Sequence, residues 1–479
     1  MSLRSRFLFS LFIASASLSA QVTAGQAGVE SFRIRFGVGA TAEQKWDGAV
    51  TVSAGELVEV RNWHPRPEDE MIGRNEWRLS THKMLNYTWR PVESPPNTGT
   101  REYFWPRGVV VDVKAQPGTR VNVRTEQGRF AFNVGEIALL EEKAFLNGRV
   151  LVDRVPTVGA LTGAEYEDDY AAMLSGAGGE VWTAWVAFKD GANFVMARRF
   201  DGSSWGPVQQ VTEQPGDVFL VKLGRDIKGR PWAIWSNQID GNFDLYARPF
   251  NGRDWGPVER LTDAPGPDVF PATVTDSAGN LWLAWQGYRN GQSDIFVRRF
   301  DGDSWSEPFL ASDSTANDWE PTLAADSKGR VTVGWDTYDT GDYNIRMRSY
   351  ERGEWKEPAP VADTKLYEAN VSLLYDKQDR LWAVWNESGM NWGKDTGWLL
   401  NLEGTRLYES RNIGLAVHDG SGWKQPAGDI NEQLPKEYSE RFDDFPKLSL
   451  DSEGRVWVFA RQRLQRRRDT PGDTPNHRA

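Results

Sequence analysis

The chain has 479 residues, of which 39% are hydrophobic and 12% aromatic, and its formal net charge is −11. This length and apolar content can bury the cores of two ordinary domains, so disorder is not the default expectation for this chain. The acidic balance argues against nucleic acid or anionic lipid as the main partner, and the absence of cysteine excludes disulfides and thiol chemistry.

Residues 1–24 have the composition of a secretory signal peptide. Two arginines precede an apolar stretch from Phe7 to Leu18, and small residues follow up to Ala20 or Ala24, either of which suits cleavage. The stretch is too short to span a membrane, and no later segment reaches the ~18 apolar residues that a spanning helix needs. We therefore expect an exported protein, periplasmic or extracellular, with no membrane span.

Residues 28–156 read as short alternating runs separated by turn signals such as Pro117-Gly118 and Asn147-Gly148, which predicts a β-sandwich-like domain. The stretch 62–105 is irregular and is expected to leave the sheets. The predicted strands are Phe32–Phe36, Leu57–Arg61, Val109–Val113, Arg120–Thr125, Phe130–Val134 and Arg149–Val155.

From residue 165 onward a 50-residue repeat dominates the sequence. One tryptophan position recurs without exception at Trp185, Trp235, Trp285, Trp335 and Trp385. A second position, three residues earlier, holds Trp182, Trp232, Trp282, Thr332 and Trp382. Residues three apart on a strand point to opposite faces, so the two positions should fill both faces of each repeat.

Each period contains four short predicted strands, as in Phe270–Thr275, Leu281–Gln286, Asp294–Phe300 and a last strand near Trp305. Four strands in a repeat of this length form one blade of a β-propeller, so we predict an all-β fold with four-stranded blades over residues 165–465. Five periods are complete, and a sixth stops after two strands, before a polar tail at 466–479. Either the N-terminal region completes the ring or the chain is cut short; we favour the second, because an open ring exposes a sheet edge.

The unit Asp-Ser-x-Gly-x-x-Trp-x-Ala-Trp at Asp276–Trp285 resembles the TolB-like and, more loosely, the sialidase-like β-propellers of secreted bacterial proteins. The order of domains is similar to exported proteins in which a metallohydrolase-like domain follows the propeller, and this resemblance implies a further domain beyond Ala479. The sialidase Asp-box places Asp two residues before Gly, whereas Asp276 and Gly279 are three apart, which weakens a sialidase assignment.

An acidic residue stands at the start of each innermost strand, and six such acids could form a ring at one mouth of the central channel. Such a ring could hold Ca²⁺ or attract a cationic ligand, or each acid could instead accept N–H bonds in its own turn. These strand-start acids are Asp168, Asp217, Asp268, Asp318, Glu368 and Asp443. No other cofactor is indicated, and the four histidines show no metal-ligand spacing.

The clearest break in the repeat is a long connection in the fifth blade, at 386–411. Candidate catalytic residues there are Glu387, Lys394, Asp395, Tyr408 and Arg411. Candidate ligand-binding residues, which could include a sugar-stacking platform, are Asn391, Trp392 and Trp398. Alternatively, this loop packs over the channel or against a neighbouring domain.

The leading functional hypothesis is an exported, non-catalytic propeller that binds a glycan, a peptide or a neighbouring domain, as the N-terminal part of a larger hydrolase-like protein. The alternative is a carbohydrate-active enzyme, a glycosidase or polysaccharide lyase, with its site at the channel mouth. A glycosidase needs two carboxyl groups roughly 5 to 9.5 Å apart. The sequence leaves the question of catalysis open.

Overall fold

The computed structural model describes the N-terminal strands and adjoining turns between residues 30 and 155, and residues 161–162, 167–389, 411–426, 428–433 and 442–463. The described residues fall into two compact units that divide between residues 160 and 161. Almost all regular structure in both is strand, and the described helices are the short η1 (Ala177–Gly179) and α2 (Ile430–Gln433). None of the described helices has the length and apolar character to span a bilayer.

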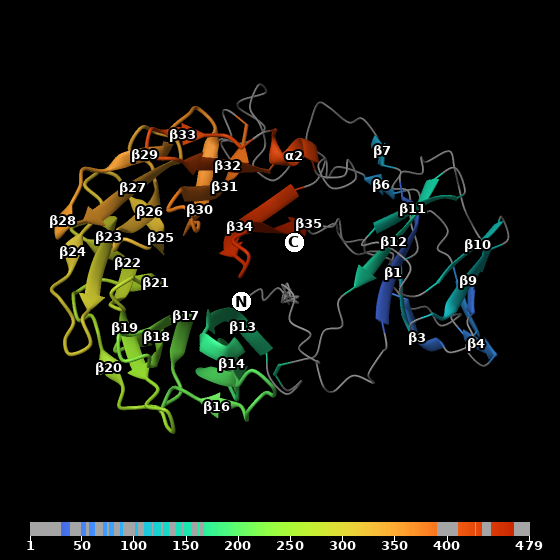
Figure 1. The fold of residues 1–479 in the computed structure, drawn as a ribbon, viewed down its shortest axis with the longest axis horizontal. Coiled ribbons are helices and arrows are strands. Elements are labelled where there is room, and N and C mark those ends of the chain that lie inside the picture. Colours follow the sequence, from blue (N-terminus) through green and yellow to red (C-terminus); the bar gives the residue numbers. More distant parts are fainter. Residues whose placement is uncertain are drawn as a thin grey trace. The chain divides into compact units, whose positions relative to one another are not determined.

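The N-terminal unit contains two five-stranded antiparallel sheets, drawn in blue to cyan in Figure 1, with strand orders β11-β12-β1-β8-β3 and β10-β9-β2-β5-β4. On β9, Val121 and Val123 are fully buried, while the residues that alternate with them, Arg120, Asn122 and Arg124, are exposed. This alternation is that of a sheet covered on one face. The strands are β1 (Glu30–Val38), β2 (Ala49–Ser53), β3 (Leu57–Asn62), β4 (Glu70–Gly73), β5 (Glu76–Ser80), β6 (Tyr87–Trp89), β7 (Arg101–Tyr103), β8 (Val110–Ala115), β9 (Arg120–Thr125), β10 (Gly128–Asn133), β11 (Leu140–Phe145) and β12 (Gly148–Val155).

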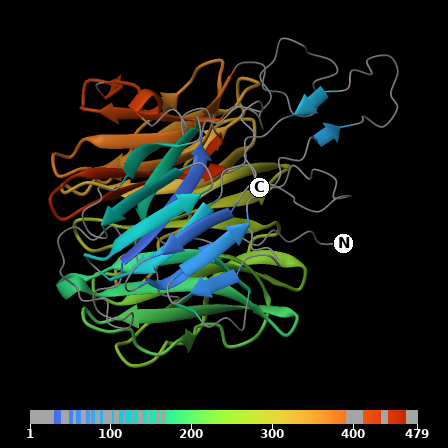
Figure 2. The same cartoon turned by 90° about the vertical axis from the view of Figure 1, so that its right-hand side faces the viewer.

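The second unit is the predicted β-propeller, whose blades follow one another around a central axis in Figure 1. Figure 2 shows the first blade in green and the fifth in orange on opposite sides of the propeller. Blades one to three are β13 (Glu167–Ser175), β14 (Val181–Lys189), β15 (Ala192–Phe200), β16 (Gln209–Gln210); β17 (Asp217–Arg225), β18 (Pro231–Ile239), β19 (Asn242–Pro249), β20 (Glu259–Arg260); and β21 (Asp268–Thr275), β22 (Leu281–Arg289), β23 (Gln292–Phe300), β24 (Phe309–Leu310).

The fourth blade has an additional short strand. Within the described residues the sixth blade has two strands, which is what the repeat predicted. The sixth blade packs through β34 against β30 and β31 of the fifth. Blades four to six are β25 (Asp318–Ala325), β26 (Val331–Thr337), β27 (Asn344–Glu351), β28 (Glu354–Trp355), β29 (Ala359–Ala362); β30 (Tyr367–Tyr375), β31 (Leu381–Ser388), β32 (Asn412–His418), β33 (Trp423–Lys424); and β34 (Phe442–Leu450), β35 (Val456–Arg463).

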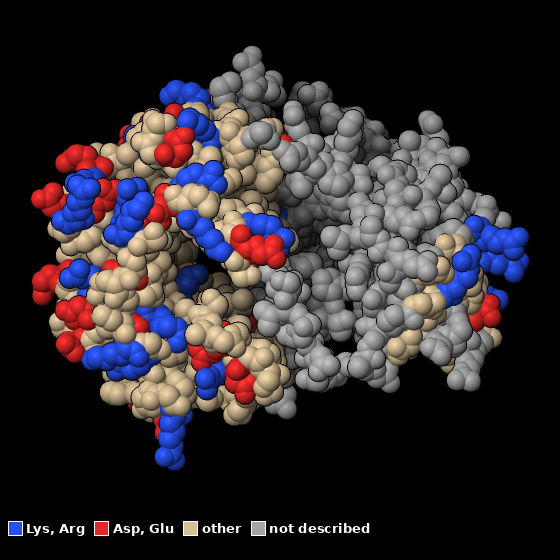
Figure 3. All heavy atoms as spheres, viewed as in Figure 1, with Lys and Arg blue, Asp and Glu red and all other residues tan. Residues whose placement is uncertain are grey.

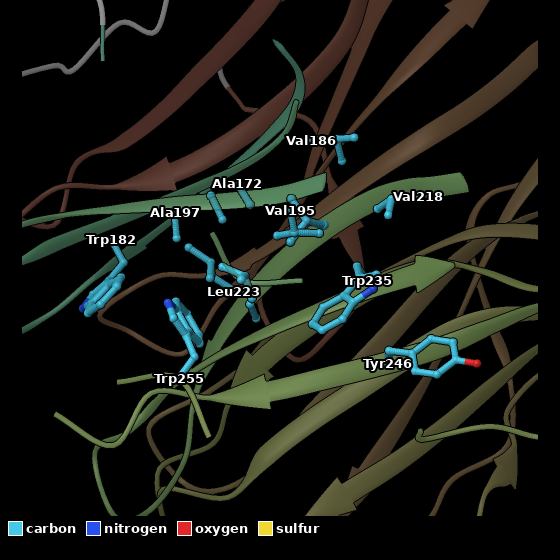
Figure 4. Close-up of a cluster of buried hydrophobic side chains, with 14 of the residues drawn as sticks. Ala172, Trp182, Val186, Val195, Ala197, Val218, Leu223, Trp235, Tyr246 and Trp255 are labelled. Atoms are coloured by element: carbon cyan, nitrogen blue, oxygen red, sulfur yellow. The ribbon is translucent and has the colours of Figure 1, made fainter. Parts of the chain in front are cut away.

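The hydrophobic core lies between neighbouring blades, as the close-up of the first two blades shows (Figure 4). Trp182 of blade one packs against Phe250 and Trp255 of blade two, with ring centroids 4.6 and 5.7 Å away. Trp235 of blade two belongs to the same cluster, whereas Trp232 belongs to the cluster shared with blade three. The two tryptophan positions therefore cover opposite faces of a blade, as predicted.

In blades two to six an aspartate follows the innermost strand, and in most of these blades it holds both the hairpin and one tryptophan. Asp276 accepts bonds from the backbone N–H groups of Ala278 and Asn280, both at 2.9 Å, and from the Trp282 indole at 2.8 Å. In blade four, where Thr332 replaces this tryptophan, the Thr332 hydroxyl bonds instead to Tyr375 of the next blade at 2.8 Å. The aspartate is thus a structural element of the repeat.

The last strand of a blade begins later than the position expected near Trp305. Trp305 forms an isolated bridge with Phe300, and the fourth strand, β24, starts at Phe309. Pro308 separates the two, and because proline has no N–H to donate, the ladder resumes only after it.

An arginine on the third strand of each of the first four blades ties that blade to a backbone segment that precedes the blade. In each case Nη1 donates to a carbonyl oxygen 37 residues earlier in the chain. The pairs are Arg198–Leu161 at 2.8 Å, Arg248–Val211 at 2.6 Å, Arg298–Leu261 at 2.5 Å and Arg348–Ala311 at 3.2 Å. These periodic arginines are part of the scaffold.

Candidate functional site

All six innermost strands contain a β-bulge whose central residue has a left-handed backbone. The ladder of each strand shifts register at this point. A non-glycine residue in this conformation costs of order 1 to 3 kcal/mol and re-aims its side chain. The residues are Tyr170 (φ 54°), Leu220 (φ 56°), Phe270 (φ 53°), Glu320 (φ 48°), Asn370 (φ 58°) and Phe445 (φ 50°).

At three of these bulges, a side-chain oxygen of the preceding blade accepts a hydrogen bond from the backbone N–H group of the central residue. Gln286 Oε1 accepts the N–H of Glu320 at 3.3 Å, Asp336 Oδ2 accepts that of Asn370 at 2.7 Å, and Asn386 Oδ1 accepts that of Phe445 at 3.1 Å. The bulges are therefore held by the ring of blades. Because the backbone is fixed in this way, the side chains at the bulges can differ in chemistry from blade to blade.

Two lysines stand two residues beyond the bulge, Lys222 on β17 and Lys447 on β34. The four other innermost strands carry small residues at the same position, which are Ala172, Ala272, Thr322 and Ser372. Among the described residues, no hydrogen bond or ion pair within 4.0 Å is made by either ammonium group. Both lysines are thus charged groups without a direct partner in the described part of the chain.

The lysines meet Glu320 across the centre of the propeller. Lys222 interacts electrostatically with Lys447 and with Glu320, although the three come from blades two, six and four, which are not neighbours. Groups from alternate blades can approach one another only through the central channel. Figure 3 shows this opening, with Lys or Arg atoms inside it.

Burial lowers the pKa values of both amines, and the charge of Lys447 lowers that of Lys222 further. Removal from bulk water, followed by the charge of Lys447, lowers the pKa of Lys222 to about 8. The Lys447 side chain is partly exposed to solvent, yet desolvation by the surrounding protein also lowers its pKa. The negative charges of Glu320 and Asp336 partly oppose this lowering. Any additional negative charge nearby would stabilise the protonated form of an amine in such a site.

Opposite the lysines lies a pair of carboxyl groups that share one asparagine. The Asn370 side-chain amide donates to Glu320 Oε2 at 2.7 Å, and its backbone N–H donates to Asp336 Oδ2, also at 2.7 Å. Burial raises the pKa of both carboxyl groups, and the Glu320 charge raises the pKa of Asp336 further. Asp336 is the more deeply buried of the two, and Glu320 is the one that interacts electrostatically with Lys222.

Arg411, one of the predicted candidates, joins the fifth blade to the sixth. Its Nη1 lies 2.8 Å from Asp444 Oδ1, both side chains are largely buried, and its guanidinium lies over the Tyr367 ring at 5.4 Å. Arg461 approaches the other oxygen of Asp444 at 3.7 Å and covers the Phe445 ring at 4.8 Å. These contacts place two guanidinium groups beside a single carboxylate.

Glu387, a second predicted candidate, lies directly opposite the strand-start acid Glu368 on the adjacent strand. Cross-strand partners of this kind have Cβ atoms roughly 4.5 to 5.5 Å apart. Glu368 is 1% exposed, and burial raises its pKa to about 7, with the charge of Glu387 adding to the effect and two bonds from Thr364 opposing it. Burial also raises the pKa of Glu387. The structure thus brings together two of the predicted candidates, one from the long connection and one from the strand-start acids.

The other strand-start acids that the structure describes are held mainly within their own blades. Asp268 accepts two bonds from Arg289 at 2.7 and 2.9 Å and one from the Trp285 indole at 2.9 Å, while Asp318 accepts a bond from Ser314 at 2.9 Å. Burial raises the pKa of Asp168, whereas Asp217 is exposed. The side chain of Asp443 lies outside the described residues.

No group of three or more acidic, histidine or cysteine side chains within the described residues is arranged to hold a metal ion. Of the six acids expected to form a ring, the buried Asp268, Asp318 and Glu368 accept bonds from indole, guanidinium or hydroxyl groups close to them in the chain. The predicted loop residues Asn391, Trp392, Lys394, Asp395, Trp398 and Tyr408 all lie outside the described part of the chain.

Sequence reasoning missed Lys222, Lys447, Glu320, Asp336 and Asn370. A signal was present, because lysine replaces a small residue at one aligned position of the innermost strand in only two of six repeats. Such a change keeps the repeat length, so a search for breaks in the period does not find it.

No protein-family model matches the chain, and no curated protein matches it. Solved structures resemble it at low identity. A protein of unknown function from Dyadobacter fermentans is 11% identical with a TM-score of 0.43, covering 62% of this chain and 90% of its own. The Hadza microbial sialidase Hz136 is 13% identical with a TM-score of 0.41, covering 84% and 86%. TolB from Acinetobacter baumannii is 13% identical with a TM-score of 0.32, covering 56% of each chain.

Proposed function

We propose that this protein is an exported propeller that binds a carbohydrate in its central channel, without itself transforming the ligand. The observation that carries the proposal is the meeting of Lys222, Glu320 and Lys447, from three alternate blades, around one axis. Asn370 adds an amide beside Glu320, and the exposed rings of Tyr170 (41%) and Phe445 (44%) lie at the bulges of two innermost strands, β13 and β34. Hydrogen-bonding groups next to aromatic faces suit the two kinds of surface that a sugar presents.

Calorimetric titration of the purified chain against a panel of oligosaccharides tests this proposal. At least one member should bind, and Phe445→Ala should weaken its affinity by about tenfold because an aromatic contact of roughly 1 to 1.5 kcal/mol is lost. Tyr288→Ala is the matched control, because Tyr288 is similarly exposed (45%) but lies at the end of the second strand of blade three. The proposal is wrong if no oligosaccharide binds or if both variants behave like the wild type.

The second candidate function is a carbohydrate-active enzyme, and the carboxyl pair Glu368 and Glu387 favours it. Two carboxyl groups in one environment, one of them with its pKa raised to about 7, are what general acid catalysis near neutral pH requires. Under this hypothesis the wild type releases reducing ends from a polysaccharide, and Glu368→Gln and Glu387→Gln each lower kcat at least 100-fold. An absence of turnover across the panel would leave binding as the function.

A further inference from the structure

Two buried carboxyl groups lie near one another between blades three and four. Asp294 on β23 is 7% exposed, Asp318 at the start of β25 is 0% exposed, and the two interact electrostatically. The Ser312 hydroxyl lies 3.5 Å from Asp294 Oδ1, and the Ser314 hydroxyl donates to Asp318 Oδ2 at 2.9 Å. Within the described residues, neither carboxyl group forms an ion pair. A buried carboxylate is unfavourable unless a positive charge compensates it.

The repeat provides an internal comparison, because the carboxyl groups 50 residues earlier each have an arginine. Arg260 Nη2 lies 2.7 Å from Asp244 Oδ2. Arg289 Nη2 lies 2.7 Å from Asp268 Oδ1. The positions 50 residues after these two arginines carry no positive charge, and they are Leu310 and Asp339. The carboxyl pair between blades three and four therefore lacks the compensation that the same pair receives one period earlier.

A row of buried oxygen atoms lies on the same side of blade four as Asp318. Thr337 is directly opposite Asp318 in the ladder and Asn344 is directly opposite Thr337, so these three side chains share one face of the sheet. Thr337 and Asn344 are both 0% exposed. The Asn344 amide nitrogen donates to Thr340 and Asp342 at 2.6 and 3.1 Å, which fixes its orientation. Among the described residues, Asp318 Oδ1 and Asn344 Oδ1 have no hydrogen-bond donor.

We propose that the protein binds one calcium ion between blades three and four, with Asp294, Asp318 and Asn344 as ligands. Carboxylate, amide-carbonyl and hydroxyl oxygens are the ligands that Ca²⁺ takes, and the hydroxyl groups of Ser312 and Thr337 lie beside these three. The two carboxylates balance the charge of the ion, which does the work of the two arginines one period earlier. This site goes beyond the proposed function, and it connects two neighbouring blades.

Calorimetric titration of the chelator-treated chain with calcium chloride tests the site. We expect one bound ion per chain, and Mg²⁺ should bind at least tenfold more weakly because it loses its waters reluctantly. Asp294→Asn and Asp318→Asn should each weaken calcium binding at least tenfold, since each removes one charged ligand. Calcium should raise the unfolding temperature of the wild type, and this rise should be absent in both variants. Without calcium, both variants should unfold no earlier than the wild type, because an uncompensated buried charge has been removed.

A substitution at Leu310 tests the comparison between repeats without touching a ligand. Leu310 is 46% exposed and pairs with Phe296 as Arg260 pairs with Tyr246 one period earlier. Leu310→Arg should therefore supply Asp294 with a guanidinium partner and weaken calcium binding at least tenfold. Leu310→Gln is the matched control, because it is also polar but uncharged, and it should leave the affinity for calcium unchanged.

The inference is wrong if the chain binds no calcium, or if Asp318→Asn and Leu310→Arg both bind it as tightly as the wild type does. Equal affinity for Mg²⁺ would overturn the assignment to calcium. None of these outcomes depends on the oligosaccharide titrations, so this site and the carbohydrate site stand or fall separately.

Discussion

At the scale of single residues, neighbours decide what each charged group can do. Asp276 and Asp336 are both buried acids, but Asp276 accepts two backbone N–H groups and an indole, whereas Asp336 accepts one backbone N–H beside the charge of Glu320. The first serves the hairpin, and the second belongs to the channel. Residue type and burial alone do not separate these two roles.

Glu368 gives a prediction on stability against pH. Its pKa is about 7 in the folded protein and near 4.5 in the unfolded chain, so between these values the folded state binds more protons. The contribution of Glu368 to the free energy of unfolding of the wild type is therefore complete below pH 4.5, and it is lost as the pH rises towards 7. Glutamine does not ionise, so Glu368→Gln does not lose this contribution at high pH. The variant should therefore have a free energy of unfolding up to about 3 kcal/mol higher than that of the wild type at pH 8.

Urea unfolding at pH 4.5 and pH 8 measures this difference. Asp318→Asn is a useful comparison, because burial also raises the pKa of Asp318, from 3.8 to about 6, and this variant should gain stability with rising pH in the same direction. A difference between Glu368→Gln and the wild type that does not change with pH would contradict the assignment.

At the scale of elements, each blade is stabilised by a small set of repeated contacts that vary in only a few places. The inter-blade arginines and the hairpin aspartates recur with the period, whereas the fourth blade has Thr332 in place of tryptophan. This substitution offers a natural control, since Asp326 keeps the bonds to the N–H groups of Lys328 and Arg330 at 2.8 Å but has no indole to accept.

Asp276→Ala should therefore destabilise the propeller more than Asp326→Ala does. Both changes remove two backbone bonds, but only the first leaves a buried indole N–H unsatisfied, which costs about 1 to 3 kcal/mol more. Chemical denaturation followed by tryptophan fluorescence measures the difference. Equal losses in the two variants would show that the indole bond contributes nothing.

At the scale of the whole molecule, the chain contains two units with separate cores. Val123 is fully buried in the N-terminal sheets and Val333 is fully buried between blades of the propeller. We expect two calorimetric transitions, with Val123→Ala lowering the midpoint of one and Val333→Ala that of the other, each by an amount equivalent to about 2 kcal/mol. A single transition that both variants shift would mean that the units unfold together.

The sequence by itself determined the propeller, its four-stranded blades, the two-stranded sixth blade and the opposite faces taken by Trp232 and Trp235. These follow from local periodicity, because strand alternation and turn residues are set by neighbours along the chain. It also indicated Glu387 and Arg411, which lie in a connection that interrupts the repeat.

Only the tertiary structure decided which charged groups meet. Lys222, Glu320 and Lys447 are far apart in the sequence and on non-adjacent blades, and they come together because the blades surround one axis and a bulge in each innermost strand re-aims the side chains. Only the tertiary structure also shows that Asp268 bonds to an indole and a guanidinium group and that Asp318 bonds to a hydroxyl group. Convergence around an axis is a property of the assembled ring, and no local pattern encodes it.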